Sequence, residues 1–342
     1  MRSTATTLTS WTRAIRKALE AAGVDSRALF EAAGLDIAAL SDPQARFPAA
    51  ATQTLWRLAV AATGNPAFGL EAARHAGQTS FHALGYSLSA STDLKEAFER
   101  LLRYFRVVTE VADLRFVEDG ARYRFIVDTP RGAAAPPDEA VDAFCSVVIR
   151  MCRGLYRRDY APRLVQLRRT APVDTGVYER AFRAPVEFDA PLNAIDFDRA
   201  DFEQPLEGAN PELARHNDAI SAAYLARFEQ SRLSTRVHAL LVEALPSGVP
   251  SQEQVAKSLL LSSRSLQRKL AEEGRSYKQL LDETRRDLAL SYLRDARYSI
   301  SELGYLLGFA DTSSFTHAFR RWTGSAPSRY VTEQAARVST EG

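Results

Sequence analysis

Cysteine is scarce in this 342-residue chain, and its placement argues against a disulfide framework. Cys145 and Cys152 lie in the apolar run AFCSVVIRMCRGLY. Their spacing brings both to one face of a predicted helix, where the Cα atoms would be about 10 Å apart, too far for a disulfide bond. We therefore predict two free thiols that act as small core hydrophobes.

Long apolar runs and metal-ligand spacings are also missing. No apolar run approaches ~20 residues, and the N-terminus lacks the apolar segment of a secretory signal. There is no C-x2-C spacing, and His75, His216 and His238 have no partner at metal-ligand spacing. The sequence therefore predicts a cytoplasmic protein with no membrane segment, no metal and no cofactor.

Neither sign of charge is in large excess, but the charge is unevenly placed. The net charge is +2, whereas residues 251–330 hold thirteen Lys and Arg against nine Asp and Glu, which leaves −2 for the remainder. An excess of positive charge in this region favours a nucleic-acid partner. The length itself predicts two domains, and 46% apolar with 25% charged residues indicates a globular chain.

Residues 300–330, ISELGYLLGFADTSSFTHAFRRWTGSAPSRY, carry the clearest local pattern. Two helical runs are separated at 308–311, where the apolar period breaks and Asp311 can cap the second helix. Phe315 and Phe319 would face inward, so the opposite face is polar and basic. A short helix, a tight turn and a second helix of this kind is the helix-turn-helix plan. The exposed face of the second helix is predicted to carry Thr312, Ser313, Thr316, His317 and Arg320.

An earlier stretch, residues 251–274, repeats this pattern. Ser251 can cap a helix together with Gln254, residues 260–262 make the turn, and 263–273 form the second helix. The pairs Ser262/Asp311, Leu266/Phe315 and Leu270/Phe319 are each 49 residues apart, which indicates an internal duplication. Outside or on the flank of this second helix are Arg264, Ser265, Gln267, Arg268 and Lys269.

The segment between the two copies predicts one continuous helix. Residues 277–297 contain neither Gly nor Pro. About twenty helical residues span about 30 Å, close to the ~34 Å between successive major grooves on one face of B-DNA. One chain could therefore read two half-sites.

The first 200 residues mix helices with a few antiparallel strands, without the βαβ alternation of a dinucleotide fold. The sharpest break in composition is PSGVP at 246–250. We therefore predict an α+β domain over 1–230, an all-α domain over 231–335 with helix-turn-helix units at 251–274 and 299–323, and a tail over 336–342. Predicted helices are 9–23, 26–33, 37–40, 48–63, 66–75, 81–89, 94–108, 139–158, 173–182, 211–230 and 235–245, and predicted strands are 114–117, 123–127, 164–167, 185–188 and 194–197.

The C-terminal motifs resemble the DNA-binding domain of AraC/XylS-type transcriptional regulators, through SLQRKLAEEGRSYKQLL and the 300–330 stretch. Leu260 and Gly304 depart from the family's usual Gly and Ala. FGLEAARHAGQTSFHALGYSLSASTDLKEAFERLLRYFRVV, VYERAFRAPVEF and PLEGANPEL resemble the arabinose-binding-like regulatory domain of one branch, over roughly residues 15–230. The resemblance implies a sequence-specific regulator, more often an activator, whose N-terminal domain senses a small molecule, dimerises, or both.

The same resemblance assigns partners and site residues. The expected partners are double-stranded DNA, RNA polymerase, an unidentified small-molecule effector and a second copy of the chain. Arg268 and Gln267 are candidates for base contact, with a solvated helix face as the alternative, and the fork of Arg268 suits guanine. Thr312, Ser313, Thr316 and His317 hold the matching places in the second unit, which is expected to discriminate less. Lys269, Arg320 and Arg321 are expected to contact phosphates.

Two other classes stay open from the sequence. One is a DNA-binding protein fused to an enzyme with a nucleophilic Cys, although neither cysteine has a neighbouring His, and the other is an architectural protein without a sensor. The most family-like stretch mixes aromatic and cationic residues, but none is assigned to the effector. Dimerisation is a hypothesis, with helices 139–158 and 211–230 as candidate surfaces. The residues weighed for a sensor pocket are His82, Tyr86, Arg103, Tyr104 and Arg106.

Overall fold

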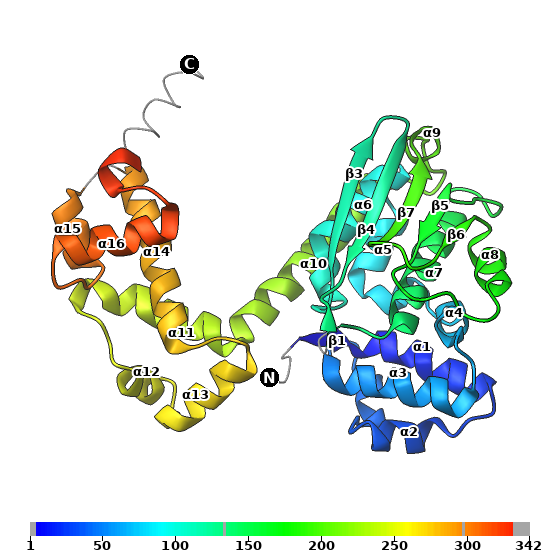
Figure 1. Cartoon of the computed structure of the whole chain (residues 1–342), viewed down its shortest axis with the longest axis horizontal. Coiled ribbons are helices and arrows are strands. Elements are labelled where there is room, and N and C mark those ends of the chain that lie inside the picture. The colour runs from blue at the N-terminus through cyan, green and yellow to red at the C-terminus, as the bar shows by residue number, and fades with distance from the viewer. Residues whose placement is uncertain (1–4, 133–134, 296–297, 331–342) are drawn as a thin grey trace. The chain divides into compact units, whose positions relative to one another are not determined.

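The computed structural model describes residues 5–132, 135–295 and 298–330, and the chain divides into compact units of residues 2–227 and 228–342 (Figure 1). The predicted end of the linker helix at Arg297, the predicted domain end at 335 and the tail at 336–342 lie outside the described residues.

A five-stranded sheet with the order β3-β4-β7-β5-β6 forms one part of the N-terminal unit (Figure 1). The predicted hairpin is confirmed, with Phe116 opposite Phe125 and Gly120 at a positive φ of 60° in the turn. β5 and β6 pair in parallel, so the prediction of antiparallel strands is wrong for this pair. α8 lies between them in the chain and supplies the crossover that a parallel pair needs. The strands are β3 (Asp113–Asp119), β4 (Arg122–Asp128), β5 (Leu164–Gln166), β6 (Val186–Glu187) and β7 (Asn193–Asp198).

Helices make up most of the rest of this unit, so the predicted mainly helical α+β class is confirmed. A small second sheet, β1 (Thr6–Leu8) with β2 (Arg46–Pro48), was not predicted. Thr6–Leu8 and Arg46–Pro48 each carry one apolar residue other than proline, so neither shows the alternation by which a strand is recognised. The helices are α1 (Thr9–Ala21), α2 (Ser26–Ala32), α3 (Ala49–Thr63), α4 (Phe68–Arg74), α5 (Ala83–Ser89), α6 (Leu94–Tyr104), α7 (Asp138–Leu155), α8 (Gly176–Phe182), α9 (Arg199–Phe202) and α10 (Pro211–Ser231), with 3-10 turns at Ile37–Ser41, Gln78–Phe81 and Phe105–Val107.

Aromatic rings join the helices to the sheet. Phe98 of α6 packs against four rings of β3, β4, β7 and α9, with centroid distances between 4.9 and 5.3 Å. α7 is buried without a break from Val141 to Ile149, so the hypothesis that it forms a dimer surface is wrong. Cys145 and Cys152 are fully buried and free, as predicted.

α10 is fastened to the N-terminal unit by a buried arginine that sequence reasoning missed. Arg100 of α6 bonds Asp218 of α10 at 3.0 Å and Glu96 at 2.9 Å. The side chains of Leu213 and Ile220 on α10 remain 47% and 38% exposed. This helix therefore keeps an apolar strip outside the core of its own unit.

The C-terminal unit is all helical and has two small apolar cores, which share one helix (Figure 1). α14 gives Leu280 to the first core and Ala289 and Leu293 to the second. The predicted continuous helix between the two copies is confirmed as far as Asp295. The helices are α11 (Leu233–Ala244), α12 (Gln252–Ser258), α13 (Ser263–Glu272), α14 (Tyr277–Asp295), α15 (Ile300–Leu306) and α16 (Thr312–Thr323), with a 3-10 turn at Leu245–Ser247.

Candidate DNA-binding surface and effector pocket

The first helix-turn-helix unit, α12 with α13, is closed by caps at each helix end. Ser251 accepts from the Gln254 N–H at 3.2 Å while the Gln254 side chain accepts from the Ser251 N–H at 2.6 Å, which confirms the predicted capping box. After α12 the chain turns through Leu260 at a φ of +58°, and the Leu261 N–H donates to the Ala256 carbonyl at 2.9 Å. These bonds set the angle at which α13 leaves the turn.

The second unit, α15 with α16, uses the same bonds at equivalent positions. Ser299 and Glu302 form a second capping box, which the sequence analysis did not identify. Gly308 has a φ of +70°, and the Phe309 N–H donates to the Gly304 carbonyl at 2.9 Å. The capping and turn residues are 48 apart in the two units, whereas the second helices are 49 apart because Ala310 adds one residue to the later turn. The duplication is therefore structural as well as sequential.

The outer face of α13 is open and basic. Leu266 and Leu270 are buried on its inner side. Arg268 has a side chain that is 63% exposed and pairs with Glu272 at 2.5 Å. The pair lies along the helix surface, so a DNA contact by Arg268 would exchange this exposed partner for a phosphate or a base. Four of the residues predicted to contact DNA are exposed on this helix: Arg264, Gln267, Arg268 and Lys269.

The outer face of α16 carries hydroxyls that are already hydrogen-bonded within the protein. The Thr316 hydroxyl donates to the Thr312 carbonyl at 2.8 Å, and the Thr312 hydroxyl donates to Ser301 at 3.3 Å. Arg321 donates to Asp282 of α14 at 2.8 Å and so connects α16 to the linker helix. One shallow depression is lined by five of the predicted residues: Thr312, Ser313, Thr316, His317 and Arg320.

Arg285 of α14 is a positioning residue that the sequence analysis missed. Its guanidinium donates to the carbonyls of Leu307 and Gly308, each at 2.8 Å, and lies 4.4 Å from the centroid of the Phe309 ring. Burial lowers the pKa of this half-buried group. Arg285 therefore satisfies the free carbonyls at the end of α15 and holds the second turn against the linker helix. In the sequence, Arg285 is one of several charged residues of 277–297, and no local pattern distinguishes it from the others.

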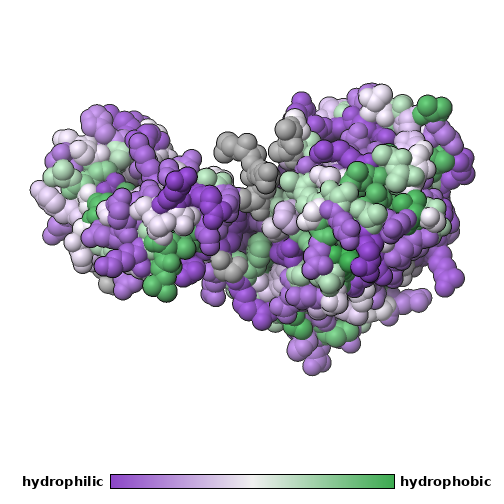
Figure 2. Space-filling model, turned by 90° about the horizontal axis from the view of Figure 1, so that it is seen from below, coloured by the Kyte–Doolittle hydropathy of each residue, from purple (hydrophilic) through white to green (hydrophobic). Residues whose placement is uncertain are grey.

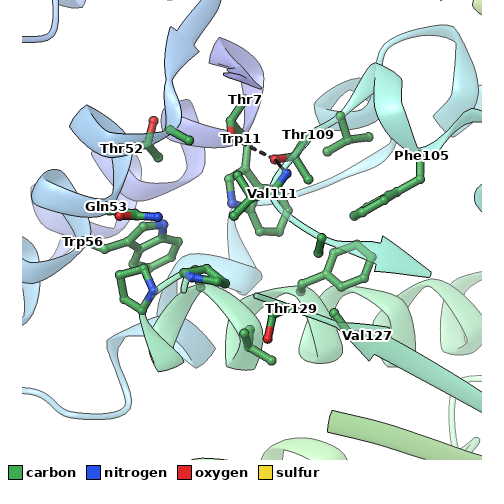
Figure 3. Close-up of a pocket in the computed structure, with 18 residues that line it drawn as sticks. Thr7, Trp11, Thr52, Gln53, Trp56, Phe105, Thr109, Val111, Val127 and Thr129 are labelled. Carbon is green, nitrogen blue, oxygen red and sulfur yellow. Dashed lines mark hydrogen bonds between the residues drawn. The ribbon is translucent and has the colours of Figure 1, made fainter. Parts of the chain in front are cut away.

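A cavity in the N-terminal unit is the candidate effector pocket. It encloses about 630 Å³ of empty space, including its open mouth, between α1, α3, β4, α7 and the segment after α6 (Figure 3). Its lining residues come from parts of the chain that are far apart in sequence, so no local motif marks them. They are Thr7, Trp11, Ala49, Thr52, Gln53, Trp56, Phe105, Val108, Thr109, Val111, Ala112, Val127, Thr129, Pro136, Pro137, Ala140, Val141 and Phe144.

None of the residues weighed for a sensor pocket lines this cavity. His82 packs beside Tyr224 of α10, with ring centroids 5.2 Å apart, and has a positive φ of 55°. Burial, aided by the charge of Arg227, lowers the pKa of His82. Tyr86 is 45% exposed. Of the described residues in the family-like stretch, Phe105 and Val108 line the pocket.

The cysteines do not provide the activated thiolate that the enzyme alternative requires. Burial raises the pKa of both the Cys145 and Cys152 thiols. A catalytic thiolate needs the opposite shift and access to substrate. Among the described residues, no group of three or more His, Cys, Asp or Glu side chains could hold a metal ion, and no helix is long and apolar enough to cross a membrane.

Two helix-turn-helix units that repeat one plan and share α14 define a DNA-binding protein of the regulator class. The face of the C-terminal unit that is visible in Figure 2 is mainly hydrophilic. Residues 255–333 match the family model of a helix-turn-helix domain, and residues 23–206 match that of the arabinose-binding domain of AraC transcription regulators. The chain belongs to the AraC-type family of transcriptional regulators. It is therefore a DNA-binding transcription regulator with an arabinose-binding-like N-terminal domain.

Relatives of known name match over most of the chain. The ornithine utilization regulator of Pseudomonas aeruginosa is 32% identical over 311 residues, which cover 90% of this chain and 91% of the relative. The regulator VirS of Mycobacterium tuberculosis is 27% identical over 268 residues, 78% of each chain. The crystal structure of the regulator CdpR from Pseudomonas aeruginosa is similar with 25% identity and a TM-score of 0.49, covering 94% of this chain and 97% of that one.

Proposed function

We propose that the first helix-turn-helix unit reads base sequence and that the second mainly fixes the protein on the DNA backbone. The observation that carries this division is the contrast between the two outer faces. Arg268, Gln267 and their basic neighbours on α13 are exposed, whereas Thr312 and Thr316 on α16 already donate within the protein. Arg and Gln side chains can make bidentate contacts with bases, whereas Ser and Thr discriminate among them weakly.

The proposed roles follow from reach and charge. Arg268 contacts a guanine and Gln267 an adjacent base, while Arg264, Lys269 and Arg320 contact phosphates. Arg321 adds a phosphate contact only if it leaves Asp282. Ser313 and His317 are exposed at the second groove and complete the proposed interface. The nineteen residues of α14 span about 28 Å, which suits two successive major grooves.

A pair of variants tests this division. The DNA is a duplex selected by the protein from a random library, and binding is measured by gel-shift titration against that duplex and a scrambled one. Arg268→Ala should lose about 1–3 kcal/mol on the selected duplex and relax one base preference. Lys269→Ala should weaken binding to both duplexes alike and make the salt dependence shallower. Equal losses on both duplexes for Arg268→Ala would refute its base-reading role.

We further propose that residues 1–230 sense a small molecule and form a homodimer, and that 231–335 bind promoter DNA in the cytoplasm and activate transcription through RNA polymerase. The pocket between α1, α3 and α7 supports the sensing role. The exposed apolar residues Leu213 and Ile220 on α10 support dimerisation. A monomer in analytical ultracentrifugation at micromolar concentration would refute the dimer.

A further inference from the structure

We infer that the pocket of the N-terminal unit binds a neutral, largely apolar molecule that contains an aromatic ring and a carbonyl or hydroxyl group, and not a sugar or a charged amino acid. The inference rests on the proposed sensing function and names the chemistry of its effector. It depends on three features of the lining: charge, ring content and hydrogen-bonding groups with spare capacity.

The first feature is the absence of charge. Among the described residues that line the pocket, none is an Asp, Glu, Lys, Arg or His. A charged group that leaves water for such a site loses its hydration and gains no ionic partner from the lining, since the nearby Arg168 already donates to the Thr129 carbonyl and hydroxyl. A carboxylate or an ammonium ion would therefore bind at a large disadvantage relative to a neutral group of the same shape.

The second feature is a wall of large rings. Trp11 and Phe144 have ring centroids 6.4 Å apart, and Phe105 lies 5.1 Å from Phe144 on the same side. Trp56, whose indole packs against Phe68 at 6.1 Å, forms another part of the wall (Figure 3). These side chains are buried, so the space between them is already shaped before a ligand arrives. Flat apolar ligands make the best contact with such walls.

The third feature is a pair of polar groups with spare hydrogen-bonding capacity. Gln53 is 8% exposed, and its side-chain amide is not among the fully enclosed polar groups of the described residues, so it can be reached from the pocket. Figure 3 places this amide beside the Trp56 ring, at the edge of the pocket. The Thr129 hydroxyl accepts from Arg168 at 3.1 Å, which leaves its own hydrogen to donate. The Gln53 amide keeps some accessible surface, and a ligand carbonyl or hydroxyl could take the place of water as its partner.

The threonine hydroxyls elsewhere in the wall each take part in a hydrogen bond within the protein. The hydroxyls of Thr7 and Thr109 bond each other at 3.0 Å, and the Thr52 hydroxyl donates to the Pro48 carbonyl at 3.3 Å. A pentose brings a hydroxyl on nearly every carbon, and most of these would be buried without partners. The pocket therefore does not suit arabinose, despite the description of the family model, nor ornithine, which appears in the name of one relative.

A matched charge series tests the inference on the full-length protein. Benzamide, benzoate and benzylamine share one ring and differ in charge, and L-arabinose and L-ornithine complete the set. Binding is followed by tryptophan fluorescence, because Trp11 and Trp56 lie in the pocket wall, and by thermal shift. Trp322→Phe removes the third tryptophan as background. We expect saturable quenching and a raised Tm with benzamide, at least tenfold weaker binding of benzoate and benzylamine, and none of arabinose or ornithine.

Two substitutions place the binding site. Gln53→Leu should weaken benzamide binding at least tenfold, whereas Gln44→Leu, an exposed glutamine outside the lining, should leave it unchanged. Equal loss in both variants, or none in Gln53→Leu, would overturn the site. Benzoate, benzylamine, arabinose or ornithine binding as tightly as benzamide would overturn the ligand class, and so would failure of benzamide to bind at millimolar concentration.

The same protein separates this inference from the proposed function. Affinity for the selected duplex is measured with and without saturating benzamide. A change in affinity supports sensing through the pocket. Benzamide binding that depends on Gln53 and leaves both DNA affinity and promoter activity unchanged would keep the ligand class and refute the sensing role.

Discussion

At the scale of the residue, two equivalent turn positions show how one backbone conformation is met by different side chains. Leu260 and Gly308 both follow the first helix of their unit and both have positive φ. A Cβ on Gly308 would come within 2.4 Å of the Val249 side chain, so any other residue would require Val249 to move. Leu260 is 94% exposed, so its side chain meets no obstacle and only the backbone conformation is unfavourable. Left-handed backbone at a residue with a Cβ costs roughly 1–2 kcal/mol.

Leu260→Gly should therefore stabilise the C-terminal unit. Glycine removes the left-handed penalty but raises the entropy of the unfolded chain, so we expect a net gain of about 0.5–1 kcal/mol in the free energy of unfolding. Urea denaturation of the variant measures it. Leu260→Ala is the control, since it removes the exposed side chain and keeps the Cβ. An equal gain from alanine would attribute the effect to the lost apolar surface and contradict the strain argument.

At the scale of the element, α14 is both a spacer and a structural part of each helix-turn-helix unit. Its first half packs into the core of α11, α12 and α13, and its second half into that of α15 and α16. Arg285 adds a polar connection by capping the end of α15, and Arg321 of α16 adds another through Asp282. Because α14 is shared in this way, its length sets the distance between α13 and α16, the second helices of the two units.

Arg285→Ala should loosen the second unit and leave the first intact. Two carbonyls at the end of α15 would lose half-buried donors, at a cost of about 1–3 kcal/mol. We expect DNase footprinting of the selected duplex to lose protection over one half-site only. Arg286→Ala is the matched control, because the ion pair of Arg286 in the described part of the chain is with the adjacent Asp287 and not with the second unit. Uniform loss of both half-sites would show that Arg285 acts on the whole unit.

At the scale of the whole molecule, each described apolar core lies within one of the two units. The large core of the N-terminal unit runs from Trp11 to Leu206, and the two smaller ones begin at Leu233 and end at Phe319. None of these clusters contains residues of both units. Separate cores are the physical condition for independent folding.

A fragment of residues 228–342 should therefore fold and bind the selected duplex without the N-terminal unit. We expect helical circular dichroism with a cooperative melting transition, and DNA affinity that no longer responds to a pocket ligand. If dimerisation through 1–230 contributes to binding, the fragment should bind more weakly but with the same base preferences. A fragment that does not fold would show that the units stabilise each other and would contradict the argument from separate cores.

Several elements were predictable because their signals are local. Caps such as Ser251 and Asp311, the break at 308–311 and the Gly120 hairpin are each defined within a few residues. β1 and β2 were missed because Thr6–Leu8 and Arg46–Pro48 each carry one apolar residue other than proline and show no alternation, unlike the equally short β5 and β6 with their flanking residues. The dimer surface assigned to α7 was wrong, because an apolar helix looks the same whether it is covered by its own sheet or by another chain.

The sequence by itself determined the family, the mainly helical α+β class of the N-terminal part and the duplicated helix-turn-helix plan, because periodicity, capping and turn residues act between near neighbours. Only the tertiary structure brought Trp11, Gln53, Trp56 and Thr129 around one pocket, and only it gave Arg285 the carbonyls of another helix. Both arrangements depend on contacts between residues distant in sequence. No local pattern encodes such contacts, since they arise only when separate helices and strands pack together.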